Sequence, residues 1–123
     1  MHDTERLRTE LDRFAQIVGD LAAIAARIDP ERRHELIKLR RLLSDQIGVL
    51  RVVGAKALHD PDVAAAFRTR LSAVLNVVSM HQANWPAIAI DDGLASYRDS
   101  AASAATGNRT FIEWTRAVLA QQD

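Results

Sequence analysis

Apolar residues in the first quarter of the chain recur at alternating steps of four and three. This heptad spacing keeps one stripe of a helix facing a partner helix, and it predicts a helix over residues 4–28. The stripe consists of Leu7, Leu11, Phe14, Val18, Leu21, Ala25 and Ile28. Ile17 and Ile24 widen it, as a helix of a globular bundle requires.

Three further segments show the same helical period. A helix over residues 31–58 would bury Leu36, Leu39, Leu43, Leu50, Val53 and Ala57, with Gln46 as the one polar residue of its series. A helix over residues 62–84 would place Val63, Phe67, Val74, Val78 and His81 on one side, followed by Trp85. A helix over residues 86–105 would bury Ala87, Ile90, Leu94, Tyr97, Ala101 and Ala104. No stretch alternates apolar and polar residues as a half-buried strand does.

The three prolines mark the boundaries between these segments. Asp29-Pro30 and Asp60-Pro61 each join a residue able to cap a helix to a proline at the first helical position. Pro86 disfavours helical geometry at Trp85, so the third helix is expected to end there. There are two alternatives. The third and fourth helices could be one helix kinked at Pro86, or a loop over residues 91–93 could delay the start of the fourth helix.

Residues 106–109, Thr-Gly-Asn-Arg, are typical of a helix stop followed by a turn. Thr110 and Glu113 then form a capping box, which predicts a last short helix carrying Phe111, Trp114 and Val118. Short connections between helices of similar length favour antiparallel neighbours. The sequence therefore predicts one all-α domain over residues 1–123, an antiparallel up-down bundle of four long helices with a short fifth C-terminal helix.

Composition limits the classes of function without selecting one. The chain has 16 basic and 16 acidic residues, so its net charge favours neither nucleic acid nor an acidic membrane. It has no cysteine, which excludes disulfides, thiol catalysis and thiolate metal sites and suits the cytoplasm. No apolar run approaches the roughly 18–20 residues needed to span a bilayer, so no membrane contact is expected. The excess of arginine over lysine indicates a bacterial source.

The segment His34-Glu35-Leu36 opens the second predicted helix. A histidine followed by an acidic residue on a bundle helix resembles the phospho-accepting box of sensor kinases, and the resemblance implies phosphotransfer at His34. The proline that this box carries shortly afterwards is absent, and a solvated histidine in a basic turn is the alternative. Glu31 and His34 also have the Glu-x-x-His spacing of di-iron bundles, but no second such pair exists, so no metal site is expected.

His81 is the histidine placed on an apolar stripe. An imidazole there, with a pKa near neutrality, suits a ligand contact, a proton carrier or a pH switch. Aromatic residues gather in the following third of the chain, which makes it the best candidate for a pocket. The candidate ligand-binding residues are His81, Asn84, Trp85, Asp91, Asp92, Tyr97 and Trp114. The alternative is that His81 is a hydrogen-bonded core histidine and the aromatic rings fill the bundle end.

Two helix faces are candidates for contact with another protein. One is the basic face of the second helix, formed by Arg33, Arg40, Arg41 and Arg51. It could dock phosphates or an acidic partner, although it has no interleaved aromatic residue for stacking on bases, so nucleic acid is not expected. The other is the seam of Leu7, Leu11 and Phe14, whose regularity predicts a homodimer.

Catalysis has little support in the sequence. There is no Gly-x-Ser-x-Gly elbow, and the five glycines are scattered and form no phosphate-binding loop. Neither an enzymatic activity nor a cofactor is therefore expected. By elimination, the sequence predicts a small interaction or regulatory module that acts through a protein-binding surface. A small-ligand-binding bundle, or a phosphotransfer bundle, is the alternative.

Overall fold

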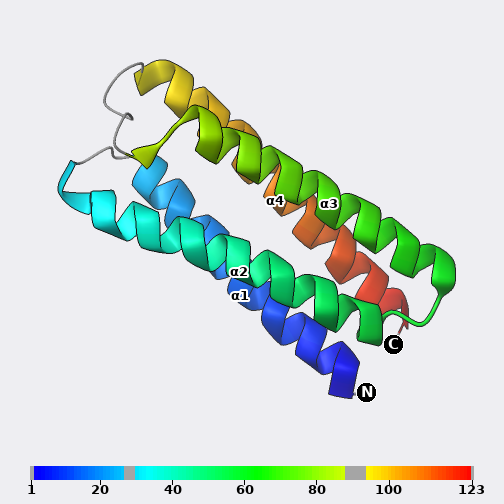
Figure 1. Cartoon of the computed structure of the whole chain (residues 1–123). Coiled ribbons are helices and arrows are strands. Elements are labelled where there is room, and N and C mark those ends of the chain that lie inside the picture. The colour runs from blue at the N-terminus through cyan, green and yellow to red at the C-terminus, as the bar shows by residue number, and fades with distance from the viewer. Residues whose placement is uncertain (1, 27–29, 88–93, 123) are drawn as a thin grey trace.

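The computed structural model in Figure 1 describes residues 2–26, 30–87 and 94–122. The helices of this part are α1 (His2–Ala26), α2 (Arg33–Ala57), α3 (Pro61–Asn84) and α4 (Leu94–Gln122), with a 3-10 turn η1 (Pro30–Arg32) before α2. No strand occurs among the described residues. The predicted all-α bundle is therefore confirmed.

The four helices form a ring in which each one packs against two others. The helix α1 lies against α2 and α4, and α3 lies against the same two helices from the opposite side. Successive helices run in opposite directions, so the N-terminus and the C-terminus lie at the same end of the bundle (Figure 1). The starts of α2 and α4 and the ends of α1 and α3 meet at the other end, which is where the candidate site lies.

The predicted fifth helix is wrong, because α4 runs without a break from Leu94 to Gln122. The segment predicted to be a turn, residues 106–109, is helical throughout. Gly107 has open space around it and costs roughly 1 kcal/mol in a helix interior. Burial of Phe111 and Ile112 beyond it stabilises the helix by more than that.

The heptad of α4 in fact continues across this segment. Its buried positions are Tyr97, Ala104, Asn108, Phe111 and Thr115, with the half-buried Ala101 and Val118 in the same series. Two of these positions, Asn108 and Thr115, are polar, so a series made of apolar residues alone ends before Asn108. Thr110 does not cap a new helix, because its hydroxyl donates to the Thr106 carbonyl oxygen one turn earlier, at 3.0 Å.

The ends of α3 agree with the predicted roles of two prolines. Pro61 occupies the first turn, and the Asp60 carboxylate accepts hydrogen bonds from the backbone N–H groups of Asp62 and Val63 at 2.8 and 3.3 Å. The helix ends at Asn84, two residues before Pro86, so the predicted break is confirmed. Asp29 and residues 91–93, which carry the other boundary predictions, lie outside the described residues. The fourth helix, predicted from residue 86, has its described start at Leu94.

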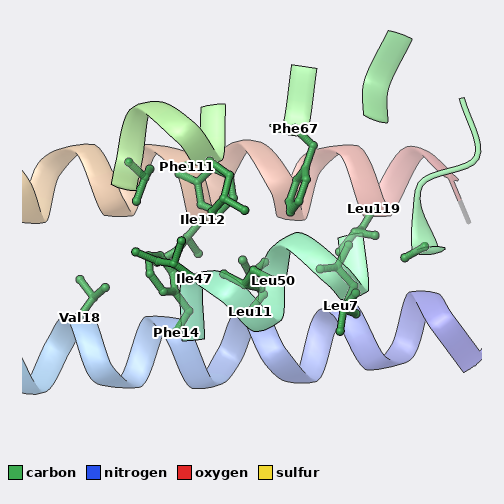
Figure 2. Packing of buried hydrophobic residues seen from close by; sticks show 14 of the residues in the cluster. Leu7, Leu11, Phe14, Val18, Ile47, Leu50, Phe67, Phe111, Ile112 and Leu119 are labelled. Carbon is green, nitrogen blue, oxygen red and sulfur yellow. The ribbon is translucent and has the colours of Figure 1, made fainter. Parts of the chain in front are cut away.

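Most of the core is one apolar cluster that runs along the bundle axis. Figure 2 shows Leu7, Leu11 and Phe14 of α1 facing Phe111, Ile112 and Leu119 of α4, with side chains of α2 and α3 between them. The ring centroid of Phe111 lies 5.5 Å from that of Phe67 and 6.1 Å from that of Phe14. A second, smaller cluster of Ile24, Leu36, Leu39 and Tyr97 fills the end opposite the chain termini.

Gln46, the one polar residue in the stripe of α2, has a structural role. Its Nε2 donates to a carboxylate oxygen of Glu10 at 2.9 Å and to the backbone carbonyl of Glu10 at 2.8 Å. Glu10 is buried as well, and its other oxygen pairs with Arg13 at 3.1 Å. These bonds occur at one relative position of α1 and α2, so they select the register of the two helices.

Two glycines of α2 provide a matched prediction about packing. A Cβ atom at Gly54 would overlap the Phe67 ring, whose Cζ would lie only 2.7 Å away, whereas a Cβ atom at Gly48 would meet nothing within 4 Å. We expect Gly54→Ala to lower the free energy of unfolding by about 1–3 kcal/mol through overpacking. Gly48→Ala should raise it by about 0.5–1 kcal/mol. Urea unfolding of both variants checks this, and equal effects would contradict the close approach of α2 and α3.

Candidate functional site

A cavity lies between all four helices near the end formed by Trp85 and Tyr97. It has a solvent-accessible volume of about 50 Å³ and is partly open to the surface. That volume holds on the order of four water-sized groups. The space exists because five of its lining residues are alanines, Ala22 and Ala25 of α1 and Ala101, Ala104 and Ala105 of α4. We call this space the Arg40 cavity, after the one charged residue that lines it.

Arg40 reaches the cavity from α2. Its Nη1 donates to the backbone carbonyl of Trp85 at 2.7 Å. That carbonyl has no helical partner because α3 ends at the residue before it, so the break before Pro86 supplies the acceptor. The other terminal nitrogen, Nη2, is buried and has no hydrogen-bond partner.

His81 and two aromatic rings lie beside the guanidinium. The Nδ1 atom of His81 is 2.7 Å from the hydroxyl oxygen of Ser100, which joins α3 to α4. The imidazole stacks on the Tyr97 ring with centroids 5.6 Å apart and planes at 26°. Trp85 meets the same Tyr97 ring edge-on at 5.9 Å. The bond to Ser100 and the stack on Tyr97 give the half-buried His81 the contacts of a hydrogen-bonded, packed histidine, and the residue also lines the cavity.

Burial shifts the pKa values of all three titratable groups of the cavity. It lowers the pKa of Arg40, an effect that Tyr97 partly opposes through charge and hydrogen bonding. It also lowers the pKa of His81, and the nearby positive charge of Arg40 lowers that pKa further. Burial raises the pKa of Tyr97, against the opposing influence of Arg40. Since a guanidinium stays protonated in proteins, the cavity holds one positive charge beside a neutral imidazole and a neutral phenol at pH 7.

The lowered pKa of His81 predicts a loss of stability in acid. The unfolded chain, in which the histidine has its ordinary pKa of 6.5, binds a proton at a pH where the folded chain does not. The free energy of unfolding should therefore fall as the pH drops below about 6.5. Urea unfolding from about pH 5 to pH 8 should show a smaller pH dependence for His81→Gln than for the unchanged protein. The exposed His59 supplies the control, since His59→Gln should keep the full dependence; equal profiles for the two variants would contradict the assignment.

The other candidate ligand-binding residues are only partly brought together. Asn84 is exposed at the end of α3 and does not line the cavity. Trp114 belongs to the main core near the chain termini, where the Arg70 guanidinium lies 4.5 Å from its ring centroid. Asp91 and Asp92 lie outside the described residues. Of the expected set, His81 and Tyr97 line the cavity, and Trp85 lies beside it, in contact with Arg40 and Tyr97.

The residues of the two faces expected to contact another protein do not form continuous surfaces. Leu7, Leu11 and Phe14 are 0, 1 and 0 % exposed, so they form the core of a single chain and no surface seam. Arg40 points into the cavity, whereas Arg41 and Arg51 are exposed and Arg33 is half-buried. The four arginines therefore do not form one continuous basic face.

Three polar residues of the cavity, Arg40, Gln82 and Asn108, were not among the ligand-binding residues expected from the sequence. Asn108 is only 6 % exposed, and its side chain has no hydrogen-bond partner among the described residues. The heptad step from Ala104 to Phe111 is the signal that could have found it. A second signal was the position of Arg40, four residues after the buried Leu36 and three before the buried Leu43.

Several other findings bear on the class of the protein. Among the described residues, no group of three or more histidine, aspartate or glutamate side chains could hold a metal ion. No helix in the same part of the chain is long and apolar enough to cross a membrane. Comparison with protein-family models, with curated proteins and with solved structures finds no match to this chain.

Proposed function

We propose that this bundle is a small-ligand-binding module and that the Arg40 cavity is its binding site. The observation that carries the proposal is Arg40, the one charged residue that lines the cavity, whose terminal nitrogen Nη2 is buried and has no hydrogen-bond partner. A buried donor left unpaired costs about 1–3 kcal/mol, and more when it belongs to a charged group. A bound hydrogen-bond acceptor would recover that free energy, so a ligand in the cavity would stabilise the folded protein.

A catalytic role has weaker support. Ser100 and His81 form a hydroxyl and imidazole pair at 2.7 Å, the arrangement of a nucleophile with its base. Ser100, however, lies inside α4, where the backbone N–H groups are used within the helix and cannot stabilise an oxyanion. Among the described residues, no third side chain forms a hydrogen bond that orients the imidazole. Binding is therefore the function that this geometry favours.

The interaction module and the homodimer have weaker support than the ligand-binding module, because the described residues show no distinct surface for a partner. The residues expected to form their seam fill the core of one chain, and the large exposed apolar side chains, such as Leu42, Val52 and Met80, are distributed over two helices. Scattered side chains of this kind are normal on a monomer surface. Any partner would therefore have to use residues that the heptad pattern does not single out.

Phosphotransfer at His34 also has weaker support than ligand binding. His34 is exposed at the start of α2, as a phospho-accepting histidine must be. The adjacent Glu35, however, is held by Arg32 through two hydrogen bonds of 3.0 and 3.1 Å. The same Arg32 contact holds the pKa of Glu35 below its usual value, which makes this carboxylate a poor proton acceptor for the histidine. We place the module in the bacterial cytoplasm, a proposal supported by the absence of cysteine and the excess of arginine.

Native mass spectrometry of protein purified gently from its own host tests the binding function. We expect a discrete extra mass on each chain, and we expect Arg40→Met to abolish it. Arg41→Met is the matched control, because Arg41 is the next residue of the same helix but is exposed, and that variant should keep the extra mass. If the ligand is lost during purification, a thermal-shift screen of small metabolites on the ligand-free protein should detect it. The proposal fails if neither experiment yields an Arg40-dependent ligand.

A further inference from the structure

We propose that the ligand of the Arg40 cavity is a small monocarboxylate, with its carboxylate on the Arg40 guanidinium and a short apolar tail against the alanine walls. This inference rests on the proposed ligand-binding function and adds the chemical class of the ligand. Three properties of the cavity lead to it, namely its charge, its size and the distribution of its polar atoms.

The charge of the cavity calls for an anion. Arg40 is the one charged residue among its lining residues, and no described acidic side chain pairs with it. Arg40 is half-buried, and a cation that is partly removed from water without a counter-charge is unfavourable, because the protein interior solvates it poorly. The acceptor that Arg40 does have, the Trp85 carbonyl, is neutral, and so is the nearby Tyr97 phenol. A ligand with one negative charge would neutralise the cavity.

The geometry of the donors favours a carboxylate among the small anions. A guanidinium matches the two oxygens of a carboxylate, and hydrogen bonds between the two are charge-assisted. One terminal nitrogen of this guanidinium, Nη2, has no hydrogen-bond partner, and in the proposed complex it would donate to one oxygen. Asn108 and Gln82 also line the cavity, and in the proposed complex their amides would donate to the other oxygen. Phosphate or sulfate would bring four oxygens into a space with few donors, and so would leave some of them unpaired.

The size and the remaining walls describe the rest of the molecule. The accessible volume of about 50 Å³ admits a molecule of a few heavy atoms, the size of acetate or propionate. Apart from the polar groups already named, the cavity is lined by aliphatic side chains, among them Val18, Leu43 and Val78. These walls offer nothing to a second polar group on the ligand, so a hydroxyl or ammonium at the far end would be desolvated without compensation.

The two tryptophans allow a direct binding test by NMR. Trp85 packs on Tyr97 at the cavity, whereas Trp114 lies beneath Arg70 in the other part of the bundle. Titration with acetate and propionate should shift the indole N–H signal of Trp85 in a saturable manner and leave the signal of Trp114 in place. The uncharged acetamide and propionamide, which have nearly the same shape, should bind at least about tenfold more weakly, as the loss of one charge-assisted hydrogen bond implies. Inorganic phosphate should produce no saturable shift.

Variants connect this binding to the cavity. Arg40→Met should weaken propionate binding by at least about tenfold, while Arg41→Met should leave it within about twofold. Ala104→Leu keeps the guanidinium but fills the space of the tail, so it should also abolish binding of propionate. That variant keeps the proposal testable if Arg40→Met does not fold, and circular dichroism shows whether each variant is helical.

The possible outcomes separate the two proposals. If the amides bind as well as the acids, or if a neutral molecule is found on the native chain, the ligand-binding function stands and the carboxylate is wrong. If propionate binds but Arg40→Met does not weaken it, the assignment of the anion to Arg40 is overturned. If no carboxylate, amide or native ligand occupies the protein, both proposals fail, and Arg40 Nη2 is satisfied by water alone.

Discussion

Leu11→Arg is expected to unfold the protein and not to convert a dimer into a folded monomer. Leu11 is 1 % exposed and lies in the main core between Leu7 and Phe14 (Figure 2). The substitution removes an apolar side chain, at a cost of about 2–5 kcal/mol, and buries a guanidinium that has no counter-charge. A domain of this size has a total stability of about 5–15 kcal/mol, so most of it should be lost. Circular dichroism and urea unfolding measure the loss of helix and of cooperativity.

Thr9→Arg is the matched control for this prediction. Thr9 is exposed on the same helix two residues earlier, so the same new side chain can remain in water there. Its effect on the free energy of unfolding should be within about 0.5 kcal/mol. A fully helical Leu11→Arg protein of lower mass than the unchanged protein, measured by light scattering, would instead show that the heptad of α1 forms an interface between chains.

Phe111→Ala is expected to lower the free energy of unfolding by about 3–5 kcal/mol. Phe111 is buried on α4 and its ring lies against those of Phe14 and Phe67, so the truncation opens a cavity between α1, α3 and α4. Filling of that cavity by relaxation is limited, because all three helices are held by contacts above and below it. The measurement is urea unfolding followed by circular dichroism.

The prediction for Phe111 also tests the continuity of α4. If residues 110–122 were a separate short helix, they could shift or detach when one anchor is removed, and the loss would be small. Thr110→Ala is a suitable control, because Thr110 is exposed and its hydroxyl bonds only within its own helix. A loss below about 1 kcal/mol for Phe111→Ala would argue against one packed helix over Leu94–Gln122.

The continuity of α4 matters for the proposed function as well as for the fold. Tyr97, Ala101, Ala104 and Asn108 all line the Arg40 cavity, and they do so because one unbroken helix repeats them at steps of four and three. A turn at residues 106–109 would have removed Asn108 from that wall. The fold and the candidate site therefore depend on the same feature of the sequence.

Much of the architecture could be predicted from local patterns. The heptads of α1 and α2 can be recognised from residues close in sequence, because side chains three and four positions apart share a helix face. The same holds for the cap formed by Asp60, because a cap acts over three residues. The end of α3 before Pro86 could be predicted for a similar reason, since proline restricts the residue before it. These features require no knowledge of the other helices.

Other features were decided by contacts between helices. Gly107 favours a turn when only its neighbours are considered, but the packing of Phe111 against Phe14 and Phe67 outweighs that preference of roughly 1 kcal/mol. In the same way, the heptad of Leu7, Leu11 and Phe14 is equally compatible with a partner helix from another chain or from its own. In the tertiary structure the partner helices come from the same chain, because α2 and α4 cover this stripe.

The candidate site was decided almost wholly by contacts between helices. The sequence by itself determined that His81 lies on an apolar stripe and that Trp85 and Tyr97 gather near it in the chain. It did not determine that Arg40, 45 residues before Trp85, turns inward to meet the Trp85 carbonyl. On its own helix Arg40 is one of several arginines beside a leucine stripe, and the difference between solvent and cavity at that position comes from the alanines of α1 and α4 across the bundle. Helix period places a side chain on a face, but only the packing of all four helices decides whether that face meets water, a neighbour or an unfilled space.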